Sequence, residues 1–193
     1  MGQRLWPLTQ GSSWTYQITD AVRGIFQKDV YVSAQSTVPG TNVAATSVIS
    51  TQPHLEEHSW QTVVDGKVVR LREEDRKSDQ LVRVVTWQPA LMMKALAEPK
   101  PAGWTDTTTL VETETNLLTG KVEEKEKVYA WTVEALDQSV TTPAGTFSDA
   151  IKLRRWRPDK PEWEERTYWL VPGVGKVREE GERLEELVRY EVK

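Results

Sequence analysis

The chain has 193 residues, with 25 basic and 29 acidic side chains, and a formal net charge of −4. This length can bury one sizeable core, so we expect a single domain over residues 1–193. The negative charge gives no basic field that would attract nucleic acid, and we expect no nucleic-acid partner. The absence of cysteine excludes disulfides, thiolate metal ligands and cysteine nucleophiles.

The beginning of the sequence bears on cellular location. No apolar run approaches the ~20 residues that cross a bilayer, so we expect no transmembrane segment in this chain. The sequence opens abruptly and reaches strand-like residues by Trp14. We therefore expect that an export signal or a lipid-anchor cysteine has been removed.

Alternation of apolar and polar residues predicts strands in the first third of the chain. They cover residues 11–18, 28–37, 43–51 and 55–64. In the first strand Trp14, Tyr16 and Ile18 fall on one face. Asp65-Gly66 is the clearest hairpin signal and is followed by a strand over residues 67–72.

Residues 89–97 interrupt this pattern after a strand at residues 81–87. They read Pro-Ala-Leu-Met-Met-Lys-Ala-Leu-Ala, which contains good helix formers after a proline suited to a first helical turn. We predict one short helix near residues 89–97.

Strand patterns return in the second half of the chain. The predicted strands cover residues 104–118, 121–136, 151–157, 164–171, 176–180 and 184–192. Tyr129, Trp131 and Val133 share one face, whereas the charged residues 121–127 indicate a solvated face. In the last strand Leu184, Val188, Tyr190 and Val192 would share a face, although residues 184–188 also fit a helix.

These patterns predict a mainly β protein. About eleven strands with short connections favour a single antiparallel meander. We expect the meander to form a strongly curved sheet or open barrel around an apolar interior, with the segment around Met92 covering it.

Three turn and strand segments carry a family resemblance. Leu8–Tyr16, Pro143–Ala150 and Trp169–Gly175 contain a Leu-x-x-Gly-x-x-Trp-x-Tyr pattern, a Pro-Ala-Gly-Thr-Phe turn and a Pro-Gly-Val-Gly strand break. They resemble β-rich domains of unknown function in bacterial exported proteins and lipoproteins. The resemblance implies a curved sheet like that of lipoprotein carriers, with a periplasmic or lipid-anchored location in the cell envelope.

A lipocalin-like barrel is the alternative fold. Lipocalins are eight-stranded barrels with a Gly-x-Trp near the start of their first strand. Here the spacing is Gly11-x-x-Trp14, one residue longer, which would move the tryptophan to the other side of the strand.

A short histidine motif raises the hypothesis of a zinc hydrolase. His54-Leu55-Glu56-Glu57-His58 matches H-x-x-E-H, in which two histidines on one helical face hold zinc and Glu57 would act as the base. Pro53 and the strand that follows leave little room for a helix. We favour two exposed histidines on a loop, and predict no metal, no cofactor and no catalytic residue.

Basic residues flank Trp156 in the predicted strand over residues 151–157. Lys152, Arg154, Arg155 and Arg157 could bind a phosphate, an anionic headgroup or single-stranded nucleic acid. We favour cross-strand ion pairs with the acidic side chains after the turn, which are Glu162, Glu164 and Glu165.

Two non-enzymatic functions fit these observations. The first is a cell-envelope domain that holds an apolar ligand, a lipid or a lipid-modified partner in a curved-sheet cavity. Its predicted ligand-binding residues are Trp14, Tyr16, Leu91, Met92, Met93, Leu96 and Trp131. The second is a structural or protein-interaction module of an envelope assembly that uses exposed tryptophans as contacts.

Overall fold

The computed structural model describes residues 4–160 and 164–193, and these residues form thirteen strands and no helix. The strands are β1 (Ser13–Asp20), β2 (Gly24–Thr37), β3 (Ala44–Gln52), β4 (Leu55–Val64), β5 (Lys67–Lys77), β6 (Gln80–Gln88), β7 (Met92–Leu96), β8 (Thr105–Asn116), β9 (Lys121–Thr142), β10 (Gly145–Trp156), β11 (Arg166–Val171), β12 (Gly175–Glu180) and β13 (Arg183–Glu191). No helix long and apolar enough to span a bilayer occurs in this described part of the chain.

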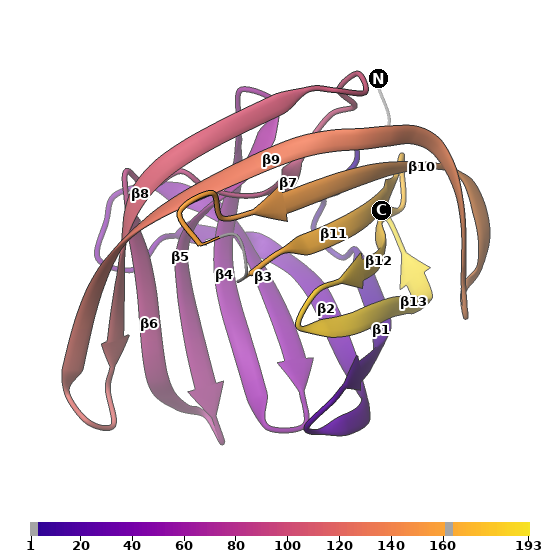
Figure 1. The fold of residues 1–193 in the computed structure, drawn as a ribbon. Helices are drawn as coiled ribbons and strands as arrows, with labels where there is room; N and C mark the ends of the chain where they lie inside the picture. The colour runs from indigo at the N-terminus through magenta and orange to yellow at the C-terminus, as the bar shows by residue number, and fades with distance from the viewer. Residues whose placement is uncertain (1–3, 161–163) are drawn as a thin grey trace.

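Twelve of the strands form a closed antiparallel barrel. With β7 set aside, each strand pairs with its neighbour along the chain, and β1 pairs with β13 to complete the ring. That closing ladder runs from Ser13 opposite Glu191 to Asp20 opposite Arg183. Closure leaves the ring without a free edge, so its backbone groups are satisfied internally. Figure 1 shows β3 to β6 standing side by side, with β8, β9 and β10 arching over them.

The predicted antiparallel meander is confirmed, but two details of the prediction are wrong, and so is the lipocalin-like alternative. The structure has thirteen strands rather than about eleven, and the barrel is closed rather than open. The twelve-stranded ring also differs from the eight strands of a lipocalin. The pairing of β1 with β13 joins residues that are far apart in the sequence, so no local pattern could indicate it.

The helix predicted near residues 89–97 is instead the strand β7. β6 pairs with the second half of β5, and β7 continues along the same side of β5 to pair with Lys67–Arg70. A segment this short gains little from helix formation on its own. Pairing with β5 satisfies its backbone groups, so tertiary context overrides the helix propensity of Ala, Leu and Met.

The last strand also departs from its predicted orientation. Residues 183–191 form β13, so the helical alternative is wrong. A bulge opposite Thr15 and Tyr16 shifts the register at Val188. As a result Glu185 and Leu187 are buried, whereas Val188 and Tyr190 are exposed.

The segment before β1 closes one end of the barrel. The Leu5 amide donates to the Ala97 carbonyl (3.0 Å), and the Gly173 amide donates to the Arg4 carbonyl (3.0 Å). The segment thereby links the end of β7 to the turn between β11 and β12. We call this the closed end. The opposite end, which carries the β1–β2, β3–β4, β5–β6 and β8–β9 turns, is the open end.

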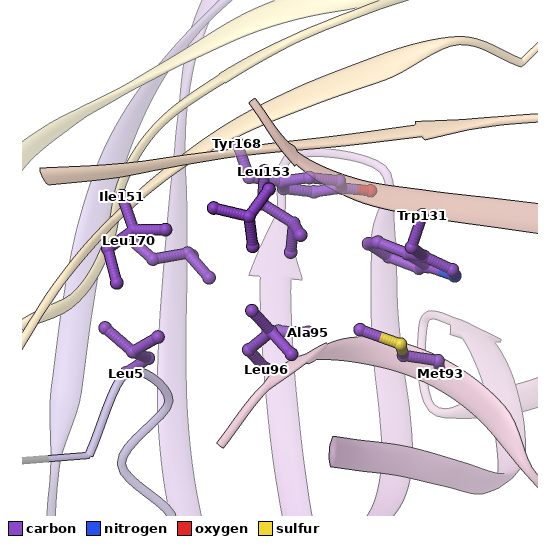
Figure 2. Close-up of a cluster of buried hydrophobic side chains, with 10 residues drawn as sticks. Leu5, Met93, Ala95, Leu96, Trp131, Ile151, Leu153, Tyr168 and Leu170 are labelled. Carbon is purple, nitrogen blue, oxygen red and sulfur yellow. The ribbon is translucent and has the colours of Figure 1, made fainter. Parts of the chain in front are cut away.

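A buried apolar cluster fills the closed end, and we call it the closed-end cluster. It consists of Leu5, Met93, Ala95, Leu96, Trp131, Val133, Ile151, Leu153, Tyr168 and Leu170. Figure 2 shows Leu5, Leu96 and Met93 on one side, facing the side chains of β9, β10 and β11. Each large side chain buried in this way contributes ~1.5–3 kcal/mol. The cluster therefore closes this end of the barrel interior with buried apolar side chains.

Candidate binding cavity

The barrel interior holds a cavity of about 630 Å³ above the closed-end cluster. Met93 and Trp6 line its inner end, and Val22 and Arg23 of the β1–β2 turn line its outer end. Val22 is 93% exposed, so the cavity opens to solvent at the open end of the barrel. Its volume lies within the ~300–1,000 Å³ range of small-molecule sites.

The structure brings together four of the seven residues predicted to bind a ligand. Trp14, Tyr16, Met92 and Met93 line the cavity. The other three are placed differently: Leu96 and Trp131 are fully buried in the closed-end cluster, and Leu91 is 41% exposed. None of these three lines the cavity.

Apolar side chains cover two parts of the cavity wall. One part comes from β1, β2 and β3, with Trp14, Val30, Val32 and Val48. The other comes from β6 and β7, with Val85, Trp87, Met92 and Met93. These side chains can contact the apolar portion of a ligand.

The rest of the wall is charged, so the predicted apolar interior is confirmed only for the closed end and for parts of the cavity wall. Ten basic and eight acidic residues line the cavity among those the structure describes. The lining therefore carries an excess of positive charge, although the whole chain has a net charge of −4. An anion entering the barrel would meet a more favourable potential than at the outer surface.

Most of these charges are paired, and the tightest pairs surround Lys176. Its ammonium nitrogen lies 2.5 Å from Glu179 and 2.6 Å from Glu185, and the Lys28 nitrogen lies 2.5 Å from Glu185. Burial alone would raise the pKa of Glu179, but the combined attraction of Lys176, Arg166 and Lys94 outweighs it and lowers that pKa to about 2. The Tyr16 hydroxyl donates to the Lys176 carbonyl (2.9 Å), which fixes the aromatic wall against this network.

A second ionic cluster lies on β4, β5 and β6. Carboxylate oxygens of Glu57, Glu73 and Asp75 all lie within 4.8 Å of one another. Arg83 donates to Glu73 and Asp75 at 3.0 Å each, and Arg70 pairs with Glu73. Because guanidinium groups already compensate these carboxylates, we interpret the cluster as a structural ion-pair network.

Lys94 differs from the paired residues. It is the extra residue of a bulge in β7, where Met93 and Ala95 pair with consecutive residues of β5. Its amine lies 5.8 Å from the centre of the Trp6 ring and lines the cavity, and no ion pair to it is found in the described part of the chain. Burial, and then the positive charge of Arg70, lower the pKa of Lys94 well below its ordinary value.

Arg155 is a buried cation that also has no ionic partner among the described residues. It is 8% exposed and lines the cavity, with its guanidinium 5.1 Å from the centre of the Tyr129 ring and 5.7 Å from that of Trp131. It lies directly opposite Arg166 in the β10–β11 ladder. Its Nε atom is buried without a hydrogen-bond acceptor.

By sequence, Arg155 was grouped with its basic neighbours, and the favoured ion pairing is confirmed only for Arg154 and Arg157. Arg154 lies 2.6 Å from Glu165, Arg157 lies 3.3 Å from Glu164, and Lys152 pairs with Glu134 instead. Glu162, the remaining predicted partner, lies outside the described residues. Strand alternation distinguishes Arg155, because it shares the inward face with buried Leu153.

The residues of the histidine motif are not assembled into a zinc site. His54 lies exposed in the β3–β4 turn, and His58 lies on β4, where its Nε2 is 2.6 Å from Glu56. Glu57 lines the cavity, on the opposite face of β4 from His58. The motif therefore lacks the single helical face that the zinc chemistry needs.

Comparison with known proteins identifies similar structures but no family. No protein-family model and no curated protein matches the chain. One similar structure is a protein from Bacteroides fragilis that is described as exported, with a YmcC-like fold. It is 12% identical to this chain, and the match covers 98% of this chain and 99% of that chain with a TM-score of 0.49. Another, described as a lipoprotein from Parabacteroides distasonis, is 16% identical, with a TM-score of 0.46 and the same coverage. These values are too low to transfer a function to this chain.

Proposed function

We propose that this chain is a non-catalytic binding domain of the bacterial cell envelope, which encloses the apolar part of a small molecule or of a lipid-modified partner. The cavity of about 630 Å³, open at one end and closed at the other, carries the proposal. Its two apolar wall regions supply contact area, and the paired charges between them hold the wall in place.

The proposed location rests on the sequence. The three segments of the family resemblance include the turn between β9 and β10 and the turn between β11 and β12. These segments resemble those of bacterial exported proteins and lipoproteins, and this resemblance supports a periplasmic or lipid-anchored domain. Fractionation of the source cells tests this: recovery of the protein in the cytoplasm would contradict the proposed location.

Native mass spectrometry of gently purified protein tests the binding function. We expect an adduct above the 22.0 kDa chain mass that organic extraction releases. The variant Val30→Trp fills space beside the cavity wall and should lose the adduct, whereas Val63→Trp, at an exposed site on β4, should keep it. An adduct equally abundant in both variants would place the ligand outside the cavity.

A protein-interaction module is the second candidate function, and exposed apolar residues near the open end favour it. Val22 lies in the β1–β2 turn, Ile25 follows it near the start of β2, and Leu117 and Leu118 lie in the β8–β9 turn. The expected contacts through exposed tryptophans are not found, because every described tryptophan is buried or half-buried; Trp163 lies outside the described residues. Sedimentation velocity that shows a monomer at all concentrations would count against self-association through these turns.

A further inference from the structure

We propose that Lys94 and Arg155 form the anion-binding part of the cavity, so that its ligand is an amphiphile with an acidic head group, a carboxylate or a phosphate. This inference rests on the proposed binding function and specifies the ligand class. The observation behind it is that, among the described residues, these two are the cations lining the cavity, apart from the exposed Arg23, that have no ionic partner; Lys94 is half-buried and Arg155 is buried.

The surroundings of Lys94 favour an incoming anion. Its amine is held at the closed end by the β7 bulge, where Arg70 and Lys176 repel it and Glu57 and Glu179 attract it. Those two carboxylates already face other partners: Glu57 lies 3.8 Å from Arg70, and Glu179 lies 2.5 Å from Lys176. A ligand carboxylate or phosphate would give the Lys94 ammonium the partner that the chain itself does not supply.

Arg155 adds a group with the geometry for oxyanions. A guanidinium presents a planar set of donors that matches the oxygens of a carboxylate or phosphate. The aromatic rings of Tyr129 and Trp131 lie against the guanidinium, with their centres at 5.1 and 5.7 Å, and the neighbouring Arg166 pairs with Glu179 at 2.9 Å. These contacts hold the Arg155 guanidinium at the cavity wall, where it can meet an anion.

The apolar lining completes the ligand class. Met93 directly precedes Lys94, and Met92 and Trp87 line the same cavity. Methionine side chains adapt to varied shapes, so this wall suits a flexible hydrocarbon chain. An acidic head at the cations and a hydrocarbon tail along the β6–β7 wall would together satisfy both parts of the lining.

Isothermal titration of a matched ligand series tests the proposal. The series is decanoate, decyl phosphate, decanol and decylammonium, which share one chain and differ in the head group. Each is titrated into the wild-type protein, Lys94→Met, Arg155→Met and the control Lys77→Met, whose lysine is exposed on β5. Neither Lys94 nor Arg155 holds a carboxylate, so these substitutions leave no buried anion unpaired and should preserve the fold.

We expect decanoate or decyl phosphate to bind the wild type at least about tenfold more tightly than decanol, as charge-assisted hydrogen bonds allow. In Lys94→Met, Arg155→Met or both, the anions should bind no more tightly than decanol, and the relative affinities of the two anions distinguish a carboxylate from a phosphate head. Equal affinity for decanoate, decyl phosphate and decanol, or a preference that survives both substitutions, would overturn the inference while leaving the proposed function standing. Binding of none of the four compounds would overturn both.

Discussion

Replacing Lys94 by methionine should stabilise the ligand-free protein. Methionine has similar length and no charge, so the substitution removes an amine whose pKa burial has lowered, without opening a large cavity. A buried polar group without a partner costs ~1–3 kcal/mol, and the contact of this amine with the cavity argues for the lower part of that range. For a chain of this size, 1–2 kcal/mol corresponds to a rise in Tm of about 2–8 °C.

The pH dependence of this gain identifies its cause. Because the pKa of Lys94 is lower in the folded protein, the unfolded chain binds more protons between the two pKa values, and wild-type stability rises with pH there. The advantage of Lys94→Met should therefore be largest near neutral pH and shrink toward the ordinary lysine pKa of about 10.4. Thermal unfolding of both proteins from neutral to alkaline pH measures it. A Tm that falls in Lys94→Met, or a gain independent of pH, would refute the reasoning.

Three further predictions concern the remaining framework. Lys176→Met should lower the free energy of unfolding by about 3–5 kcal/mol in urea titrations, because Glu179 and Glu185 lose their common partner. A loss under about 1 kcal/mol would contradict the claim that these ion pairs stabilise the fold. Wild-type stability should fall as pH drops from about 4.3 toward 2, since the pKa of Glu179 is lowered in the fold, and a flat acid profile would contradict this. Gly175→Ala should cost ~1–3 kcal/mol, because φ is +103° and the added Cβ would lie 3.3 Å from Pro7; Gly40→Ala, with φ of +78° and open space around it, should cost less.

Local turn chemistry made much of the fold predictable. Asp65-Gly66 adopts positive φ at both residues and joins β4 to β5 as expected for a two-residue hairpin. The alternation of Trp14, Tyr16 and Ile18 correctly indicated one buried face. The signals succeed because a tight turn and a half-buried strand depend on residues that are neighbours in the sequence.

Features that depend on distant residues were not predictable. β7 forms a strand because it pairs with β5. The amino acids of residues 92–96 favour a helix, and their local sequence does not indicate this pairing. The bulge that makes Lys94 an extra residue likewise arises from its register against Val68 and Val69. The burial of Lys176 and Glu185 also depends on neighbouring strands, because Lys176 of β12 pairs with Glu185 of β13, and Lys28 of β2 pairs with the same carboxylate.

A crystal structure of the protein grown with decanoate tests most directly the claim that the barrel interior is the ligand site. The account predicts the hydrocarbon chain against Trp87 and Met92, with the carboxylate within hydrogen-bond distance of Lys94 or Arg155. Decanoate bound only on the outer surface, with the cavity holding nothing but water, would contradict it.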